Sequence, residues 1–336
     1  MRFRLLINAR EAILKMDMNL KNIKLNGRYY IDGDNLYFYN GGSGFSFKIK
    51  GNSFTVSINS MPIQGYFYII LDHDYSKKIK INTKKKNYKY VFKDKNPHLV
   101  DIVKANEAND NTFKVDKFEY DGELLAFDES YRGLVKVYGD STIAGFGILE
   151  KIGIASVHNS DSVRDFCYHA LYDLNFEMDI FTASGYGLAF SAYTTPKTKG
   201  IYNYLDRVAV NQNIKWDDGD LPDLLIISLG CNDNSYIQEA TDKENRINEF
   251  KTKYRKLIDS QIKKNTRLPI LMIYGTLNEE SAYYLYEETY NYLKAFYKNL
   301  YIHKFKGDSS AISNHAYVDA HDRMAEELKR VIKEIL

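Results

Sequence analysis

A serine stands directly after an apolar segment near the middle of this 336-residue chain. The stretch from Leu134 to Glu150 reads "LVKVYGDSTIAGFGILE", so the apolar run ends in Gly-Asp-Ser and two more glycines follow Ser141 within six residues. A nucleophile on a sharp turn has this pattern, and so has an ordinary turn between a strand and a helix, because glycine permits both. Gly-Asp-Ser alone leaves the two interpretations open.

Three further stretches carry residues that could act with this serine. "FTASGYG" follows an apolar run and contains Gly185, and "SLGCNDNSY" places Asn232 just past another such run. There the asparagine amide could point into a cleft or hydrogen-bond its own turn. "SNHAYVDAHDRMAEEL" opens the last helical segment with His315 and His321. Each stretch has an ordinary explanation, but their conjunction in this order is not expected by chance.

The second half of the chain predicts the elements that position these residues. After Tyr131, strand-length apolar runs alternate with segments of helical periodicity. The runs are "LVKVYGD", "FEMDIFTAS", "DLLIISLG", "LPILMIYG" and "LYIHKFK", and the segments between them include "SVRDFCYHALYDL" and "KGIYNYLDRVAV". Five such β–α units predict a mainly parallel five-stranded sheet flanked by helices. Sites in these sheets form at the carboxyl ends of the strands, which is where Ser141, Gly185 and Asn232 stand.

The first half has a different period. From about residue 25 to 128 the sequence alternates apolar and polar residues in short runs broken by turns, as in "LYFYNGGSGFSFKIKGNSFTVSINS". This predicts an antiparallel β-sandwich of jelly-roll type. The lysines between Lys77 and Lys95 mostly alternate with apolar residues, as on a solvated strand face. We therefore expect two domains, a β-sandwich at residues 1–130 and an α/β domain at residues 131–336.

Composition excludes several classes of function. The formal net charge of +2 favours neither a nucleic-acid nor a membrane partner. Cys167 and Cys231 stand far apart without a CxxC, and His73, His98, His158, His169 and His303 are scattered. We therefore expect no disulfide framework, no metal site and no cofactor. The N-terminal "MRFRLLINAREAILKMDMN" is too short in its apolar run and too charged for a signal peptide. We expect a cytoplasmic protein, although a chain whose leader had been removed would look the same; the oligomeric state stays open.

The order of these motifs resembles the SGNH/GDSL hydrolase superfamily over residues 131 to 336. The four blocks of that superfamily fall on Ser141, Gly185, Asn232 and His315. Similarity is greatest to carbohydrate esterase family 2, the acetyl-xylan esterase type, whose members pair an N-terminal jelly roll with an SGNH domain. "NGRYYIDGDNLYFYNGGSGFSFKIKG", "WDDGDLPDLLIISLGCND" and the stretch from His315 to Leu328 resemble blocks of that family.

The resemblance implies a role for each of these residues. Ser141 would be the nucleophile, and His315 the base that takes its proton. The backbone N–H groups of Ser141 and Gly185 and the amide of Asn232 would form the oxyanion hole, which stabilises the charge that develops on the carbonyl oxygen of the substrate.

One part of the superfamily pattern is missing. The usual last block is Asp-x-x-His, but Ile312 stands three residues before His315, and Ala316 replaces the usual proline. Family 2 members use a Ser–His dyad whose imidazole is held by a backbone carbonyl or another group, so the resemblance implies a dyad here. A degenerate, non-catalytic protein would also lack the acid. His321, close to Asp319, is the rival base, and the resemblance implies a structural role for it.

Four neighbouring residues are candidates for supporting roles. We expect Asp140 to hydrogen-bond its own turn and Asp233 to tie loops together below the site. Tyr186 could line a sugar-binding cleft. Trp216 could form a wall of that cleft or pack in the core or between the domains.

These inferences converge on one leading function. We expect a serine esterase that removes acetyl groups from acetylated oligo- or polysaccharides through an acyl-enzyme. The same residues would serve a carbohydrate O-acyltransferase, in which a sugar hydroxyl replaces water. A glycan-binding relative without turnover is the third interpretation.

Overall fold

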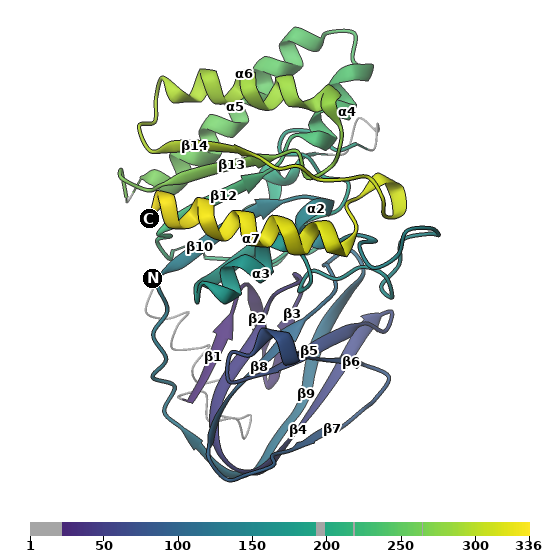
Figure 1. Ribbon diagram of the computed structural model, residues 1–336, viewed down its shortest axis with the longest axis vertical. Helices are drawn as coiled ribbons and strands as arrows, with labels where there is room; N and C mark the ends of the chain where they lie inside the picture. The colour runs from purple at the N-terminus through teal and green to yellow at the C-terminus, as the bar shows by residue number, and fades with distance from the viewer. Residues whose placement is uncertain (1–21, 193–198, 218, 264) are drawn as a thin grey trace.

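The computed structural model describes residues 22–192, 199–217, 219–263 and 265–336. Figure 1 shows an N-terminal β-domain below a C-terminal domain in which helices flank a second β-sheet. The N-terminal stretch on which the leader prediction rests lies outside the described residues. Among the described residues, no helix is long and apolar enough to cross a membrane.

The N-terminal sheet comprises β1 (Ile23–Asn26), β2 (Tyr29–Asp32), β3 (Asn35–Phe38), β4 (Gly44–Pro62), β5 (Tyr66–Leu71), β6 (Ile79–Asn82), β7 (Tyr88–Val91), β8 (Pro97–Lys104) and β9 (Asn111–Leu125).

Every strand pairing in the N-terminal sheet is antiparallel, which confirms the expected class of this half. The long strand β4 pairs with β1 and β8 along its first part and with β7 and β9 along its second part. A register shift between Gly51 and Ser53 adds a residue and so reverses which positions of β4 face inward. Its core residues are accordingly odd-numbered before the shift and even-numbered after it: Phe45, Phe47 and Ile49, then Phe54, Val56 and Ile58.

The C-terminal sheet is parallel throughout and has the order β11-β10-β12-β13-β14. Its strands are β10 (Leu134–Gly139), β11 (Glu177–Thr182), β12 (Leu224–Ser228), β13 (Ile270–Tyr274) and β14 (Leu300–Lys304). The α-helices are α2 (Ser141–Ala144), α3 (Phe166–Asp173), α4 (Cys231–Glu239), α5 (Lys243–Ile262), α6 (Tyr283–Lys294) and α7 (Val318–Ile335), with short 3-10 helices at Tyr75–Lys77, Ile201–Tyr204, Glu280–Ala282 and Ile312–Asn314.

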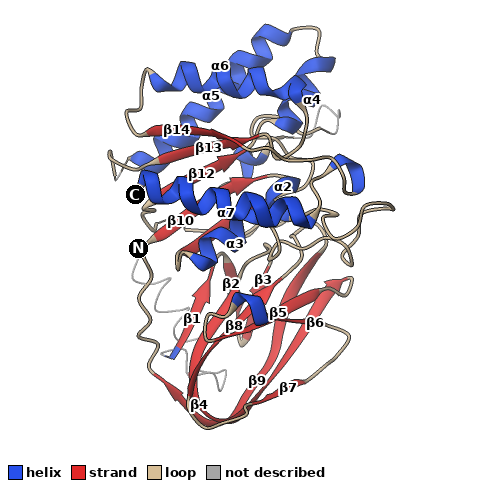
Figure 2. Cartoon of the chain, in the orientation of Figure 1, coloured by secondary structure: helices blue, strands red, loops and turns tan. Residues whose placement is uncertain are grey.

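Helices cover both faces of this sheet, as the β–α alternation predicts (Figure 2). On one face α3 and α7 pack over Val135, Val137 and Ile226, in a core that also takes in Tyr68 and Tyr75 from the N-terminal domain. On the other face α5 and α6 pack over the alternate strand residues, such as Leu225, Ile227 and Met272. The sheet is buried on both faces, which explains its nearly continuous apolar runs.

The prediction of a helix at "KGIYNYLDRVAV" is wrong. Only Ile201–Tyr204 forms a 3-10 helix there. Arg28, from the N-terminal domain, donates through Nη1 to the carbonyls of Leu205 (2.8 Å) and Arg207 (2.7 Å), and Asn40 Nδ2 donates to Val208 O (2.8 Å). In a helix these carbonyls would accept hydrogen bonds from N–H groups of the same segment, but here they accept them from the N-terminal domain. Helix propensity alone does not predict such contacts between domains.

A buried ion pair anchors the two domains. The Arg28 side chain is fully buried, with Nε 3.0 Å from Asp179 Oδ1 of β11 and the guanidinium 4.1 Å from the centre of the Phe181 ring. Residues 126–133 connect the last strand of the N-terminal sheet to β10. The limits 1–130 and 131–336 stay a prediction.

We expect Arg28→Ala to lower the free energy of unfolding by about 3–5 kcal/mol, because it leaves the buried Asp179 carboxylate without its partner. Lys24→Ala is the matched control: Lys24 also pairs across the domains, with Glu177, but both side chains are about one-third exposed. Its loss should cost less than about 1 kcal/mol. Urea unfolding of both variants measures the difference, and equal midpoints would contradict a stabilising role for the Arg28 pair.

Candidate active site

Ser141 lies where a strand of the parallel sheet is followed by a helix. β10 ends at Gly139, and Ser141 is the first residue of α2. Asp140 caps this helix, its Oδ1 accepting hydrogen bonds from Thr142 N (3.0 Å) and Thr142 Oγ1 (2.9 Å). Gly145 ends the helix in the left-handed conformation, with φ 67°. This tight turn holds the serine at the carboxyl edge of the sheet.

His315 lies beside this serine although the two residues are far apart in the sequence. Its Nε2 is 2.8 Å from Ser141 Oγ. Its Nδ1 is 3.1 Å from the carbonyl oxygen of Ser313 and 3.2 Å from that of Ile312. Because a carbonyl only accepts hydrogen bonds, Nδ1 carries the proton and Nε2 is left to accept from the serine hydroxyl. The ring therefore has the tautomer that a general base needs.

Main-chain carbonyls thus occupy the position of the carboxylate that the sequence lacks. They come from the 3-10 turn Ile312–Asn314, in which Ser313 (φ 56°) and Asn314 (φ 60°) are left-handed. Such conformations are unfavourable for residues other than glycine by on the order of 1–3 kcal/mol each. The turn is held by Ile312 N, which donates to Glu150 O (3.2 Å). This hydrogen bond helps to stabilise the unfavourable backbone conformation in which the two carbonyls face the imidazole.

Burial controls the charge of His315. Removal of the ring from water lowers its pKa below the ordinary value of 6.5, and the hydrogen bonds to Ser313 and Ile312 oppose that shift. A carbonyl has no net charge, so it stabilises an imidazolium less than a carboxylate would. His315 is therefore neutral at neutral pH and able to accept a proton.

Gly185 and Asn232 reach the same edge from the strands on either side of β10. Gly185 follows β11 with φ 81°, a conformation that favours glycine. Asn232 lies in the first turn of α4, and its Nδ2 donates to Tyr186 O (3.2 Å) and, over 3.4 Å, to Asp140 Oδ2. These bonds join the loops that carry the predicted oxyanion-hole residues. The structure therefore brings all four blocks together, and the catalytic roles stay predictions.

Two buried aspartates hold these loops. Asp233 accepts three backbone hydrogen bonds, from Leu188 N (2.7 Å), Ala189 N (2.8 Å) and Phe190 N (2.9 Å), and so anchors the chain just after Gly185. Burial raises the pKa of Asp233 to about 7 and that of Asp140 to about 6, while the hydrogen bonds they accept act in the opposite direction. Both carboxylates organise turns.

The two aromatic candidates lie in different places. Tyr186 is half-buried next to Gly185, with its ring edge-on to Tyr204. The structure does not bring Trp216 to this site. Its ring packs edge-on against Tyr29 of the N-terminal sheet, 5.4 Å between centroids, in a pocket that includes Leu134, at the opposite end of β10 from Ser141. Interdomain packing is the role that this position supports.

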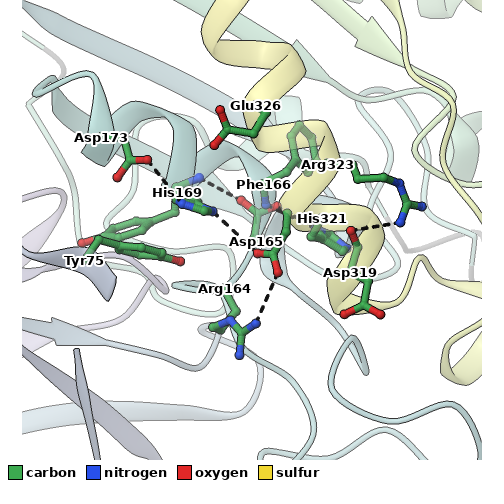
Figure 3. Close-up of polar contacts among 12 residues, drawn as sticks. Tyr75, Arg164, Asp165, Phe166, His169, Asp173, Asp319, His321, Arg323 and Glu326 are labelled. Atoms are coloured by element: carbon green, nitrogen blue, oxygen red, sulfur yellow. Dashed lines mark hydrogen bonds and ion pairs between the residues drawn. The ribbon is translucent and has the colours of Figure 1, made fainter. Parts of the chain in front are cut away.

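His321 is part of the packing between α3 and α7 (Figure 3). It is buried, and its Nδ1 accepts a hydrogen bond from Phe166 N (3.2 Å). Burial lowers the pKa of His321 to about 3, so the ring is neutral and its 3.7 Å approach to Asp165 is not an ion pair. Asp165 itself caps α3, accepting from Cys167 N (2.9 Å) and Tyr168 N (3.0 Å).

Cys231 is half-buried; burial raises the pKa of its thiol, which disfavours the thiolate, and its Sγ lies 3.5 Å from Tyr286 Oη. No group of three or more His, Cys, Asp or Glu side chains that could hold a metal ion occurs in the described part of the chain. Sequence reasoning missed Phe146, whose ring centroid is 5.1 Å from that of His315. It also left open which groups hold the imidazole, which in the structure are the carbonyls of Ile312 and Ser313, the acceptors for Nδ1–H. Asn314, a residue type that tolerates the left-handed conformation, was the one available signal for that turn.

The chain is similar to known proteins in two ways: part of its sequence matches a family model, and its fold aligns with solved structures. Residues 25–127 match the family model described as carbohydrate esterase 2 N-terminal. No curated protein matches the chain. A family two carbohydrate esterase from Clostridium thermocellum, solved in complex with cellohexaose, aligns at a TM-score of 0.80 with 21% identity, covering 93% of this chain and 98% of that one.

Two other solved structures align over the whole architecture. The acetyl xylan esterase Est2A from the rumen bacterium Butyrivibrio proteoclasticus has a TM-score of 0.80 and 14% identity, with 95% of this chain and 96% of that chain covered. The salicylyl-acyltransferase SsfX3 from a tetracycline biosynthetic pathway has a TM-score of 0.62 and 12% identity, with coverages of 94% and 95%. The two-domain fold is thus that of family 2 carbohydrate esterases, as the sequence resemblance implied.

We expect kcat/KM for an acetyl ester to rise with pH as His315 loses its proton and to reach a plateau, with a midpoint below 6.5. Burial lowers the pKa of this base, and only the neutral imidazole accepts the serine proton. A pH–rate profile with 4-nitrophenyl acetate measures the midpoint.

Asp140, with a pKa of about 6, titrates in the same region, so the midpoint must be assigned. The 15N chemical shifts of the His315 imidazole should titrate with the midpoint of the rate profile. A midpoint above 6.5 in both would mean that a negatively charged group, rather than the carbonyls, supports the ring.

Proposed function

We propose that this protein is a carbohydrate esterase that removes acetyl groups from acetylated oligo- or polysaccharides through a serine acyl-enzyme. The observation that carries the proposal is the 2.8 Å contact between Ser141 Oγ and His315 Nε2, with main-chain carbonyls at Nδ1. Support for the substrate class comes from the fold, which the carbohydrate esterases described above share, including one solved with cellohexaose.

In the first half of the reaction, Ser141 Oγ attacks the carbonyl carbon of the acetyl ester while His315 Nε2 takes the hydroxyl proton. The imidazolium keeps its orientation because Nδ1–H continues to donate to the carbonyls of Ile312 and Ser313. It then gives the Nε2 proton to the departing sugar oxygen, which leaves an acetyl group on the serine.

The oxyanion of the tetrahedral intermediate would be stabilised by the N–H groups of Ser141 and Gly185 and by the Asn232 amide. In the structure both amide hydrogens of Asn232 have acceptors, Tyr186 O and, at the longer distance of 3.4 Å, Asp140 Oδ2. The longer bond is the one that an oxyanion would displace at little cost. Loss of one such donor typically reduces the rate by ~10²–10³-fold.

In the second half, His315 removes a proton from water, and the resulting hydroxide attacks the acetyl-serine. As the tetrahedral intermediate collapses, the imidazolium gives this proton to Ser141 Oγ, so acetic acid leaves and both the serine hydroxyl and the neutral imidazole are restored. If a sugar hydroxyl takes the place of water, the same residues transfer the acetyl group, and the protein is a carbohydrate O-acyltransferase. The structural likeness to a salicylyl-acyltransferase supports the acyltransferase as a second candidate function. Free acetate as the product indicates the esterase, and an acetylated acceptor sugar indicates the acyltransferase.

The glycan-binding alternative without turnover rested on the missing acid. In this chain the imidazole is held without an acid, because two main-chain carbonyls contact Nδ1. The geometry of the dyad therefore supports the esterase over the binding protein, and the turnover measurement below distinguishes the two.

We expect Ser141→Ala and His315→Ala to lose at least about 10³-fold in kcat with 4-nitrophenyl acetate, because each removes one half of the dyad. His321→Ala is the matched control: it removes a histidine of the same region that contacts α3 and not the serine, so it should keep most of the turnover. Initial rates of the wild type and the three folded variants, measured side by side, test this.

Two further outcomes decide between the candidates. A fluorophosphonate should label the wild type at Ser141 and leave Ser141→Ala unlabelled, and activity should survive chelation because no step uses a metal. A folded wild type no faster than Ser141→Ala would overturn the esterase and favour the binding protein.

A further inference from the structure

The loop that carries Gly185 is held from the other domain. Ser184 N donates to Glu107 Oε2 (2.9 Å), and Ser184 O accepts from Asn109 Nδ2 (3.4 Å). Glu107 and Asn109 belong to the connection between β8 and β9, in the N-terminal sheet. Both backbone groups of Ser184, the residue before Gly185, are thus bonded to the N-terminal domain.

Peptide geometry transmits this restraint to the Gly185 N–H. The carbonyl of Ser184 and the N–H of Gly185 are the two ends of one planar trans peptide, so they point in opposite directions. A contact that restrains the Ser184 carbonyl therefore also restrains the direction of the Gly185 N–H. The 2.9 Å bond from Ser184 N to Glu107 is the stronger restraint, and the 3.4 Å contact from Asn109 adds to it. On the other side, the carbonyl of Gly185 accepts from Ser191 Oγ (3.0 Å) and Ala192 N (3.0 Å). The peptide units on both sides of the Gly185 Cα have fixed orientations.

The connection between β8 and β9 is itself rigidly anchored. Glu107 is 4% exposed. The buried Lys104 Nζ donates to the carbonyls of Glu107 (3.1 Å) and Asn106. Asn106 in turn donates through Nδ2 to Val157 O (2.9 Å) and accepts from Tyr66 N (2.8 Å). The Glu107 carboxylate therefore projects from a fixed point of the N-terminal sheet.

We infer that Glu107 and Asn109 are positioning residues of the oxyanion hole: they orient the Ser184–Gly185 peptide so that its N–H faces the oxyanion. The N-terminal sheet then completes the active site, in addition to any contact it makes with the glycan. This inference rests on the proposed function, because the Gly185 N–H has this task only if Ser141 attacks a carbonyl or an analogous centre.

A purely structural role makes a different prediction. If the two side chains only join the domains, their loss lowers stability and leaves turnover by the folded protein unchanged. If they orient an oxyanion donor, kcat falls and KM does not, because the oxyanion exists only in the transition state and intermediate. The split between kcat and KM therefore separates the roles.

The experiment uses Asn109→Ala and Asn109→Asp, which remove the donor to Ser184 O at an exposed position, and Glu107→Ala with Glu107→Gln, which keeps an acceptor for Ser184 N. The matched control is Asn211→Ala. Asn211 is also an exposed asparagine that bonds across the domains, to Ala108 O (2.7 Å), without touching Ser184.

With 4-nitrophenyl acetate we expect kcat to fall about 5–10-fold for both Asn109 variants and about 10–100-fold for Glu107→Ala, with KM within about twofold of the wild type. Glu107→Gln should recover most of the loss, and Asn211→Ala should match the wild type. These effects are smaller than the ~10²–10³-fold for a deleted donor, because a misdirected donor still contributes. If Glu107→Ala fails to fold, the Asn109 variants carry the test.

The rate of Ser141 labelling by a fluorophosphonate provides a readout that does not need an acetyl ester, because phosphonylation also places an oxygen in the oxyanion hole. Variants that match the wild type in kcat and in labelling overturn the inference and leave the esterase standing. Slower labelling of the variants in a protein that hydrolyses no acetyl ester supports the inference and overturns the esterase. A wild type that neither turns over nor labels overturns both.

Discussion

The contact between His315 Nδ1 and the carbonyls of Ile312 and Ser313 is the interaction on which the candidate active site depends. It assigns the proton to Nδ1, and so leaves Nε2 to accept from Ser141 Oγ. A carbonyl has no net charge, so it orients the ring and raises its basicity less than a carboxylate would. The turn with left-handed Ser313 and Asn314 is the conformation in which two successive carbonyls contact this one nitrogen.

Buried acidic side chains organise the rest of the site by accepting hydrogen bonds from backbone N–H groups. Asp140 caps the turn of Ser141, Asp233 accepts three backbone N–H groups after Gly185, and Glu107 accepts the N–H just before it. Each is buried, so each bond is strong and hard to replace by water. The loops that follow the strands of a sheet lack the regular backbone hydrogen bonds of the strands. Here the buried side chains accept hydrogen bonds from the loop backbone and so hold the loops in place.

Much of this architecture could be predicted from the sequence. Period-2 alternation before residue 128 and β–α alternation after Tyr131 correctly predicted an antiparallel sheet followed by a parallel one. Ser141, Gly185 and Asn232 could be placed on one edge because parallel strands end together. The helix expected after β11 failed, since Arg28 and Asn40 take the carbonyls that such a helix would use. Trp216 packs on Tyr29 between the domains, one of the alternatives that the sequence left open, because period and spacing do not determine what a ring contacts.

The sequence by itself determined the elements and the order of the chemical groups along them, because apolar periodicity and glycine-containing turns are local properties. Only the tertiary structure decided which histidine contacts the serine. His315 lies before α7 and its ring contacts Ser141, whereas His321 lies within α7 and its ring contacts α3. It also decided what replaces the missing acid and placed Glu107 against Ser184. Main-chain carbonyls carry no sequence signature, and a contact between two domains depends on how their surfaces meet.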